Sequence, residues 1–384
     1  MKLKIYLKRT VKILSLVLAV LLVVGISGEY VLKQYDANSI RLEGFYMEEK
    51  DSLDVVFIGA SETYAAFSSA QAYDEFGFTS YPYASGAIPV TVYKSALKQI
   101  RKTQSPKLIV CEINGALYEN EKSVNKAGSL HKYFDSVPFS LDKVQDISEA
   151  VPQELQSEFY FPFLKYHGMW DDYPSAKKFQ WVESKIYMQQ RGYSLLKGNN
   201  IGSNTFKPKT KMVKNLANDN STAELEPKSE EGLRDLLQYC KDENIDNILF
   251  VRFPHYVDKK MYKRFQRGNR AGEIINEYGF EFLNLEKNYE DIGLDFSKDF
   301  DNAEHMNIYG QKKFTSYLGN LLCEKYGVEG RQLSDTSKER WEQAVDYSKR
   351  FYNYVSKKTE EKEKKQNLET KSLMLELEKM PSES

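Results

Sequence analysis

The chain has 384 residues, of which 41% are hydrophobic and 28% charged, so it can bury a large core in one or two domains. It contains only 21 glycines and 11 prolines, which excludes collagen-like and low-complexity chains. The 54 basic residues nearly cancel the 55 acidic ones, and the central region carries no basic stripe, so nucleic acid is not an expected partner.

The first 33 residues are typical of a membrane-directing segment. Basic residues precede an apolar run from Ile13 to Ile26, and Glu29 restores polarity. The run is short for a span of about 20 residues, although neighbouring aromatic and apolar residues can extend it. We therefore expect residues 1–33 to form a cytoplasmic basic stub and a single-pass anchor, with a cleaved signal peptide as the alternative. The positive-inside rule then places the rest of the chain outside the cytoplasm, at the cell membrane.

Residues 50–328 alternate short apolar runs with amphipathic stretches that have helical spacing. The expected strands are apolar runs bounded by turn residues, and they lie at 54–58, just before Pro82, at 108–113, at 248–251 and at 280–285. Near-continuous apolar strands linked by helices indicate a parallel sheet that is covered on both faces. The predicted fold class is therefore α/β, a three-layer α/β/α arrangement with a central parallel sheet.

Two regions depart from this pattern. Residues 116–227 combine weak periodicity with many aromatics, which predicts a mixed, mostly helical insertion beside the sheet. Within it, His167 and Trp170 belong to an aromatic segment that either stacks on sugar faces or packs the insertion onto the sheet. Residues 329–384 form a charged C-terminal tail, and from Ser356 lysine and glutamate alternate, which indicates a solvated helix or a disordered segment without chemistry.

Metal chemistry is not expected from this sequence. The three cysteines are far apart and lie in apolar patterns, and the four histidines are separated and form no HExxH motif. We therefore expect neither a bound metal nor a cofactor.

The most informative constellation pairs Ser61, directly after the first strand, with His305, just before the last helix. Ligands of open α/β sheets bind at the carboxyl ends of the strands, where both residues are expected. A serine there acts as a nucleophile when a histidine takes its proton, and a helix N-terminus directs N–H groups at a developing oxyanion. Each residue alone has a simpler explanation, Ser61 as a helix N-cap and His305 as a surface hydrogen-bonding group.

This arrangement resembles the SGNH/GDSL hydrolase-like superfamily, and in particular its membrane-anchored branch found in bacterial envelope and surface-polysaccharide loci. The nucleophile block is residues 55–62, VVFIGASE, and the histidine block is residues 305–315, HMNIYGQKKFT. The likeness covers about residues 50–328 and implies a sheet of the SGNH or flavodoxin type. The chain is also distantly similar to the D-alanyl transfer protein of teichoic acid operons.

The resemblance implies roles for individual residues. Ser61 would be the nucleophile and His305 the base that takes its proton. The oxyanion would be held by the backbone N–H groups of Ser61 and Gly86 and by the side chain of Asn114. Gly86 lies in the segment YASG and Asn114 in the segment EING, where the family has its glycine and asparagine blocks.

The third catalytic position departs from the family pattern. The family usually has an aspartate three residues before the histidine, where this chain has Asn302, and Asp301 lies one residue earlier. A carboxylate also stabilises the imidazolium that forms during attack, whereas an amide fixes only the orientation of the ring. Since a loop can absorb one residue of slack, we favour Asp301 as the partner, with Asn302 as the alternative. The site is thus compatible with an esterase, an acyltransferase or a site that has lost its chemistry.

Arg252 and His255 follow another expected strand and are assigned to substrate binding in the same crevice, unless they make only local structural contacts. The sequence therefore predicts an extracytoplasmic serine acyl-ester enzyme, an O-acyl esterase or O-acyltransferase, whose partner is an acylated cell-envelope glycan. The alternative is a non-catalytic envelope scaffold with the same fold that binds glycan or a partner protein.

Overall fold

A five-stranded, all-parallel sheet forms the centre of the computed structural model, which describes residues 2–27, 36–165 and 195–377. Its order is β2-β1-β3-β4-β5, so the chain leaves β1 toward one edge and later builds from β3 toward the other. The α/β class with a central parallel sheet is confirmed. The strands are β1 (Val55–Gly59), β2 (Ser80–Ala84), β3 (Leu108–Glu112), β4 (Ile248–Arg252) and β5 (Phe282–Asn284).

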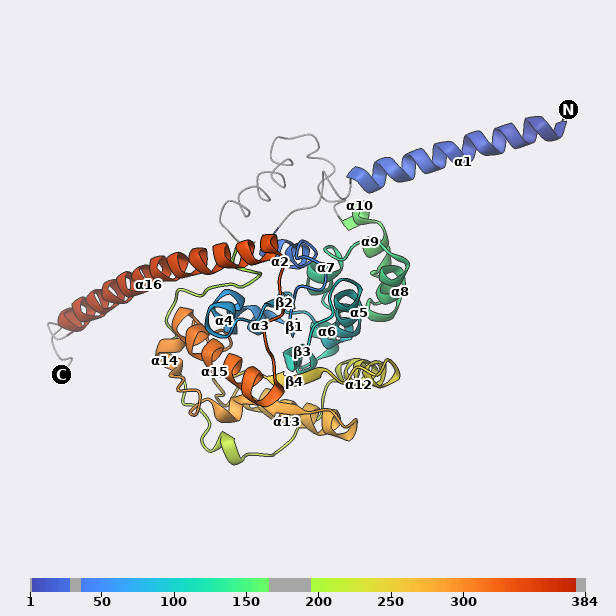
Figure 1. Ribbon diagram of the computed structural model, residues 1–384. Helices are drawn as coiled ribbons and strands as arrows, with labels where there is room; N and C mark the ends of the chain where they lie inside the picture. Colours follow the sequence, from blue (N-terminus) through green and yellow to red (C-terminus); the bar gives the residue numbers. More distant parts are fainter. Residues whose placement is uncertain (1, 28–35, 166–194, 378–384) are drawn as a thin grey trace.

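Helices cover both faces of the sheet, because successive strand residues point to opposite sides (Figure 1). Val56 and Ile58 pack with α5 (Tyr93–Thr103), α12 (Pro227–Asp242) and α13 (Tyr262–Glu277). Val55 and Phe57 pack with α3 (Ser61–Ala66), α4 (Ser69–Phe76) and α15 (Ile308–Tyr326) on the other face. The two faces thus have separate apolar cores, and apolar burial on both is the main stabilising term.

The expected second strand is placed too early by the sequence pattern. The structure continues β2 through Pro82, which pairs with Phe57 of β1. Proline has no backbone N–H to donate to a neighbouring strand. Because β2 lies at the edge of the sheet, this missing donor costs no hydrogen bond of the sheet. The last strand, β5, is shorter than the expected 280–285.

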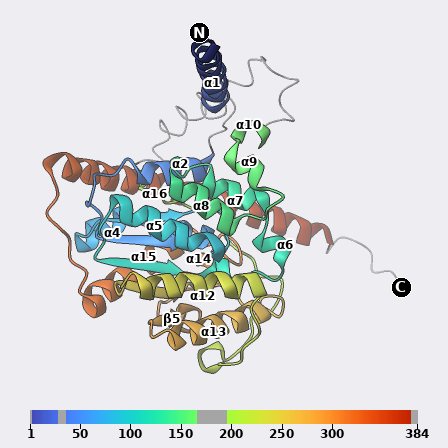
Figure 2. The same cartoon turned by 90° about the vertical axis from the view of Figure 1, so that its right-hand side faces the viewer.

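The insertion packs on the α5 side of the sheet (Figure 2). Leu130, Tyr133, Ile147 and Phe159 are buried in the same apolar core as the helices on that face. The described part of the insertion contains α6 (Glu121–Val124), α7 (Ala127–Phe134), α8 (Leu141–Ala150), α9 (Gln156–Tyr160) and α10 (Pro162–Lys165). His167 and Trp170, the expected sugar-stacking residues, lie outside the described residues.

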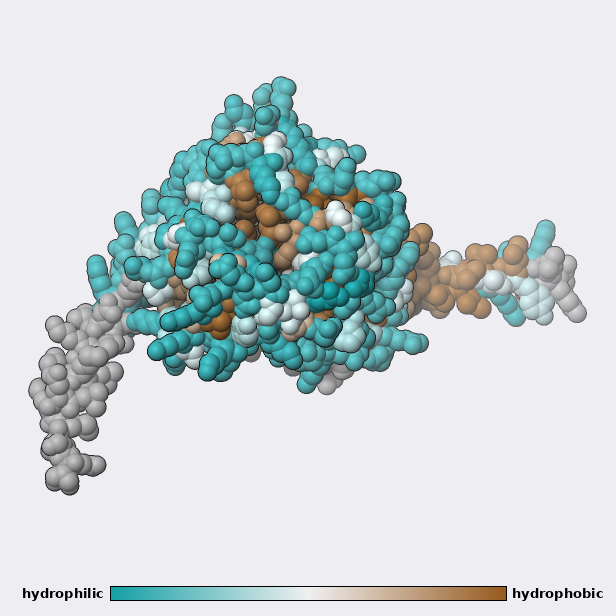
Figure 3. Space-filling view, turned by 90° about the horizontal axis from the view of Figure 1, so that it is seen from below, coloured by the Kyte–Doolittle hydropathy of each residue, from teal (hydrophilic) through white to brown (hydrophobic). Residues whose placement is uncertain are grey.

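The N-terminal helix, α1 (Lys2–Ser27), extends away from the sheet and its helices (Figure 1). Its large apolar side chains are exposed, and Figure 3 shows the brown arm that they form. Within the described ranges no helix is long and apolar enough to cross a membrane, so the expected anchor is not confirmed. A second helix, α2 (Ala37–Phe45), follows and packs beside β2.

The C-terminal tail is helical and partly buried. Helix α16 (Asp335–Leu377) buries one residue of each turn against the domain for much of its length. The buried residues are Ser337, Trp341, Ala344, Ser348, Tyr352, Val355 and Thr359. The remaining short elements are α14 (Phe296–Asp299) and the 3₁₀ turns η2 (Val90–Val92), η3 (Ile113–Ala116), η6 (Leu216–Asn218) and η7 (Leu285–Asn288).

Candidate active site

Ser61 lies where the chain turns from β1 into α3. Gly59 ends the strand, and Ser61 is the first residue of the helix. A side chain on Gly59 would collide with Thr63, so glycine permits this tight strand-to-helix turn. Because β1 and β3 continue toward opposite edges of the sheet, the carboxyl end of β1 borders the crevice where such sheets bind ligands.

The structure brings Ser61 and His305 together although 244 residues separate them. The Ser61 Oγ lies 2.7 Å from His305 Nε2, within hydrogen-bonding reach for a nucleophile and its base. Both side chains are partly exposed, so a substrate can approach them.

Asn302, not Asp301, is the partner of His305. Asn302 Oδ1 lies 3.0 Å from His305 Nδ1 and also accepts from the backbone N–H groups of Glu304, at 2.9 Å, and His305, at 3.1 Å. This side chain closes the turn that carries the histidine, which favours a spacing of three residues. The preference for Asp301 is therefore corrected: its carboxylate accepts instead from the backbone N–H of Asn204, at 2.9 Å.

These contacts define the tautomer of His305. Because Asn302 Oδ1 already accepts from two backbone N–H groups, it is an acceptor toward the ring as well. The ring proton therefore lies on Nδ1, and Nε2 is left to accept the hydroxyl proton of Ser61. Asn302 thus orients the base without adding a negative charge.

The expected oxyanion donors are partly engaged elsewhere. The backbone N–H of Gly86 donates to Asn38 Oδ1 at 2.9 Å. The side chain of Asn114 is buried, donates from Nδ2 to Glu62 and accepts at Oδ1 from Arg252 at 2.6 Å. The N–H of Ser61, in the first turn of α3, has no partner within its own helix and can serve an oxyanion.

Beneath Ser61 lies a buried charge cluster, formed by Glu62, Glu112, Arg252, His255 and Glu286. Arg252 pairs with Glu286 at 2.9 Å and with Glu112 at 3.4 Å. His255 lies between Glu286, at 3.0 Å, and Glu62, at 3.6 Å. Arg252 and His255, expected to bind substrate, are fully buried and instead compensate these carboxylates; β4 and the turn after it direct both side chains into the interior.

Burial and pairing act in opposite directions on the carboxylates of the cluster. Burial favours the neutral form of Glu62, but His255, Arg264 and His305 outweigh it and hold the pKa of Glu62 well below its ordinary value. At Glu112 burial is the largest effect. Burial and the charge of Glu62 together raise the pKa of Glu112 to about 7, although the charge of Arg252 lowers it. For His255, burial and Arg252 oppose protonation, but Glu286 and Glu62 raise its pKa. Glu62 therefore places a negative charge next to the nucleophile.

Arg264, on α13, connects the two halves of the candidate site. Its guanidinium pairs with Glu304, the neighbour of His305, at 3.0 Å and lies 3.9 Å from Glu62, the neighbour of Ser61. The Arg264 side chain is mostly buried. Sequence reasoning missed this residue, because an arginine within an amphipathic helix carries no motif.

A strap, residues 199–206, supports the turn 302–305 that carries His305, called the histidine turn below. Its Asn204 carbonyl accepts from Asn307 Nδ2 at 3.0 Å, and its Gly202 carbonyl accepts from the N–H of Ile308 at 3.0 Å. Helix α16 in turn holds the strap, since Thr359 donates to the Ser203 carbonyl at 3.1 Å and Lys362 to the Ser203 hydroxyl at 3.0 Å. The C-terminal tail, to which the sequence assigns no chemistry, thus supports the site from outside.

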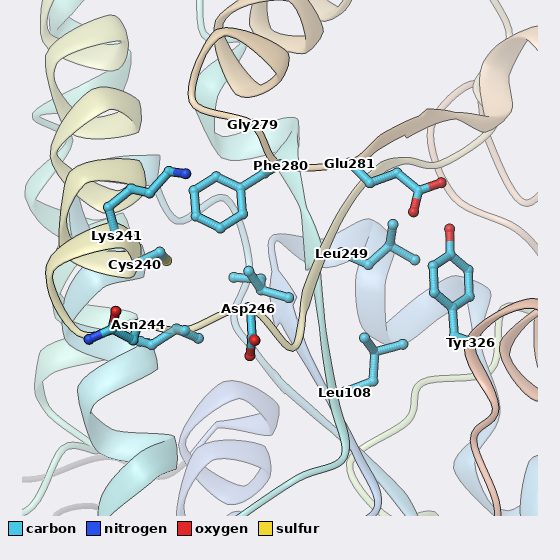
Figure 4. Close-up of a pocket in the computed structure, with 12 residues that line it drawn as sticks. Leu108, Cys240, Lys241, Asn244, Asp246, Leu249, Gly279, Phe280, Glu281 and Tyr326 are labelled. Atoms are coloured by element: carbon cyan, nitrogen blue, oxygen red, sulfur yellow. The ribbon is translucent and has the colours of Figure 1, made fainter.

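A separate pocket of 490 Å³ opens at the amino ends of β3 and β4, away from Ser61 (Figure 4). Two of its charged groups have neighbours of their own: Lys241 lies 5.2 Å from the centre of the Phe280 ring, and Glu281 pairs with Lys325 at 2.5 Å. Ligands of parallel sheets bind at the opposite end, so this pocket is not a second candidate site.

No metal site accompanies the Ser61–His305 pair: within residues 2–27, 36–165 and 195–377, no group of three or more histidine, cysteine, aspartate or glutamate side chains is placed to hold an ion. The fold and the site together define a parallel α/β protein with a serine–histidine pair at the carboxyl end of its first strand. No family model matches the chain, and a search of curated proteins found no match.

Proposed function

We propose that the protein is an extracytoplasmic serine acyl-ester enzyme that acts on a cell-envelope glycan. The observation that carries the proposal is the 2.7 Å contact between Ser61 Oγ and His305 Nε2, with the Nδ1 proton directed to Asn302. The resemblance to SGNH hydrolases supports the acyl chemistry and the glycan. The basic residues and apolar run of the N-terminus support export.

The chemistry follows from the positions of these groups. Ser61 Oγ attacks the acyl carbonyl while His305 Nε2 takes the hydroxyl proton, and the N–H of Ser61 faces the developing oxyanion. The C–O bond to the sugar then breaks, and His305 returns the proton to the leaving alcohol. Water resolves the acyl-enzyme in an esterase, and a second sugar hydroxyl resolves it in a transferase.

A non-catalytic scaffold is the second candidate, and two observations favour it. Gly86 and Asn114 donate to Asn38 and Glu62 rather than into the crevice, and the base lacks a carboxylate at Nδ1. A scaffold would keep the fold and bind glycan or a partner protein without turnover.

A membrane-impermeant fluorophosphonate probe tests both the chemistry and the location. It should label the purified full chain, and the chain on intact cells, at Ser61. Ser61→Ala should abolish labelling, and His305→Ala should slow it by a factor of about a thousand or more. In ester turnover, the double variant should be little worse than either single variant, because the pair acts as a unit. Ser148→Ala is the control, since this exposed hydroxyl donates to the Gln145 carbonyl of its own helix.

Three outcomes of the labelling experiment would contradict parts of the proposal. Labelling that persists in Ser61→Ala would remove the assignment of the nucleophile. Absent labelling, together with glycan binding that survives Ser61→Ala, would establish the scaffold. Labelling of lysates but not of intact cells would contradict the extracytoplasmic location.

A further inference from the structure

Three polar side chains converge beside Gly86, next to the candidate nucleophile. Asn38 Oδ1, Lys132 Nζ and Tyr64 Oη lie 3.3, 3.4 and 3.5 Å from the position that a Cβ on Gly86 would take. They come from α2, α7 and α3, which are far apart in the sequence. Glycine at position 86 therefore leaves room for these groups, and any larger residue would fill the space between them.

Tyr64 links this group of side chains to the site, because it lies one turn after Ser61 on α3, on the same side of the helix. The guanidinium of Arg41 lies over its ring, 3.4 Å from the centre, which adds positive charge to the same region. A ligand group that contacts Lys132 and Tyr64 would therefore lie close to the bond that Ser61 attacks.

Lys132 is the unusual member of the group. It is partly buried, yet within the described part of the chain no carboxylate lies within ion-pairing distance of its ammonium. Its neighbours on α7 are different, because His131 pairs with Asp135, which also pairs with Lys165. An ammonium held in a partly desolvated position without a counterion attracts an anion from solution.

The two carboxylates that act on Tyr64 do not fill this role. Asp36 caps α2 by accepting from the backbone N–H groups of Asn38, at 3.0 Å, and Ser39, at 2.8 Å. Glu62 accepts from Asn114 and lies within the buried charge cluster. Neither forms an ion pair with Lys132.

We infer that Lys132 binds an anionic group of the substrate beside the ester that Ser61 attacks. This inference rests on the proposed function and narrows it to esters that carry a carboxylate or phosphate near the scissile bond. The anion belongs either to the acyl group or to the alcohol, and the ammonium recognises the same chemistry in both cases.

Matched ester pairs test the inference with the full chain. One pair places the charge on the acyl group, phenyl hemisuccinate against phenyl methyl succinate, and the other places it on the alcohol, 4-acetoxybenzoate against 4-acetoxybenzamide. We expect kcat/KM to favour the anionic member of one pair by about tenfold. Lys132→Gln should remove the preference, Lys132→Glu should reverse it, and turnover of the neutral esters should change by less than about twofold.

Lys126→Gln is the matched control, because Lys126 precedes the same helix at its other end and should leave the preference intact. Equal turnover of both members of each pair by the unaltered chain would overturn the inference while leaving the acyl-ester chemistry established. A Lys132→Gln variant that loses charged and neutral turnover equally would also overturn it, since a structural role predicts that result.

Discussion

The base of the candidate site is oriented by an amide, so its positive charge must be balanced from another direction. Asn302 fixes the tautomer of His305 but contributes no charge during attack. Glu62, next to Ser61, stays ionised, and the charge of His305 is among the groups that lower its pKa. The imidazolium that forms would thus be stabilised from the nucleophile side, by a carboxylate on α3.

Arg264 should act as a positioning residue, because it holds Glu62 and Glu304 in one arrangement. Replacing it by methionine should lower kcat about tenfold, corresponding to about 1.4 kcal/mol, with little change in KM. Arg264→Lys keeps the charge but lacks the fork that reaches two carboxylates, so it should recover only part of the rate. Steady-state kinetics and the rate of fluorophosphonate labelling measure the effect.

Arg270→Met controls for the loss of an arginine on the same helix, since Arg270 pairs with Glu273 and Glu277 at the surface. Equal losses in Arg264→Met and Arg270→Met would contradict a specific role. A fall in melting temperature with unchanged kcat would assign Arg264 to stability alone.

The residues of the site differ in how well the sequence predicts them. Ser61 directly follows β1, and His305 lies in the connection between the last strand and α15; because the carboxyl ends of parallel strands meet at one edge, their approach could be expected. The choice between Asp301 and Asn302 depends on a side chain that closes a turn, which periodicity does not describe. Lys132 and Arg264 lie on helices distant in sequence, where an isolated basic residue looks the same whether it faces solvent or a site.

At the scale of elements, α16 and the strap form a continuous support for the histidine turn. Thr359 and Lys362 bind Ser203, and the neighbouring Asn204 accepts from Asn307 and donates to Asp301. Asp301 thus contributes to the site through the backbone of the strap. Helix α16 contributes no catalytic group, but through the strap it restricts the position of the histidine turn.

Truncation separates the supporting part of α16 from the rest. A chain that ends after residue 356 loses Thr359 and Lys362 but retains the buried Tyr352 and Val355. We expect its kcat to fall about tenfold with a small change in melting temperature, because positioning is lost while most of the packing remains. A chain that ends after residue 365 keeps both contacts and should match the full chain.

The two truncations are compared by ester turnover and by thermal unfolding. Equal activity of both chains would show that the strap holds the turn without α16. Equal loss in both would place the important contacts beyond residue 365.

The elements are largely predictable where their patterns are strong. The buried strands have continuous apolar runs, and the sheet follows from them. The buried face of α16 is less evident in the sequence, because the lysines and glutamates of this helix outnumber its apolar residues. A spacing of three and four residues from Trp341 through Tyr352 and Val355 to Thr359 was nevertheless present and predicts a buried face.

At the scale of the whole molecule, the buried charge cluster joins the strands to the candidate site. Glu112 ends β3, Arg252 ends β4 and Glu286 follows β5, so three neighbouring strands each contribute a charge at their carboxyl ends. Glu62 and His255 connect this group to α3 and to the turn after β4. Removing one member would leave an uncompensated charge in the interior, so the cluster ties the protonation of the site to the stability of the fold.

The stability of the fold should therefore fall both when the pH rises and when it drops. Glu112, with its pKa raised from 4.5 to about 7, stabilises the folded chain while protonated, and this contribution is lost as the pH rises through about 7. His255, whose pKa is raised above 6.5, changes stability in the same direction. Glu62 and Glu286 have pKa values below 4.5, so their contribution is present above pH 4.5 and is lost on acidification.

The melting temperature should thus be highest near pH 5 and fall by about 5 °C between about pH 5 and 7.5. Glu112→Gln removes the ionisation that drives most of this fall, because a neutral amide of similar size keeps the buried position. Its melting temperature should therefore change much less over the same interval. Glu273→Gln, at an exposed carboxylate of α13, should keep the full pH dependence. Thermal unfolding across pH 4–9 measures all three chains, and an unchanged fall in Glu112→Gln would show that another group carries it.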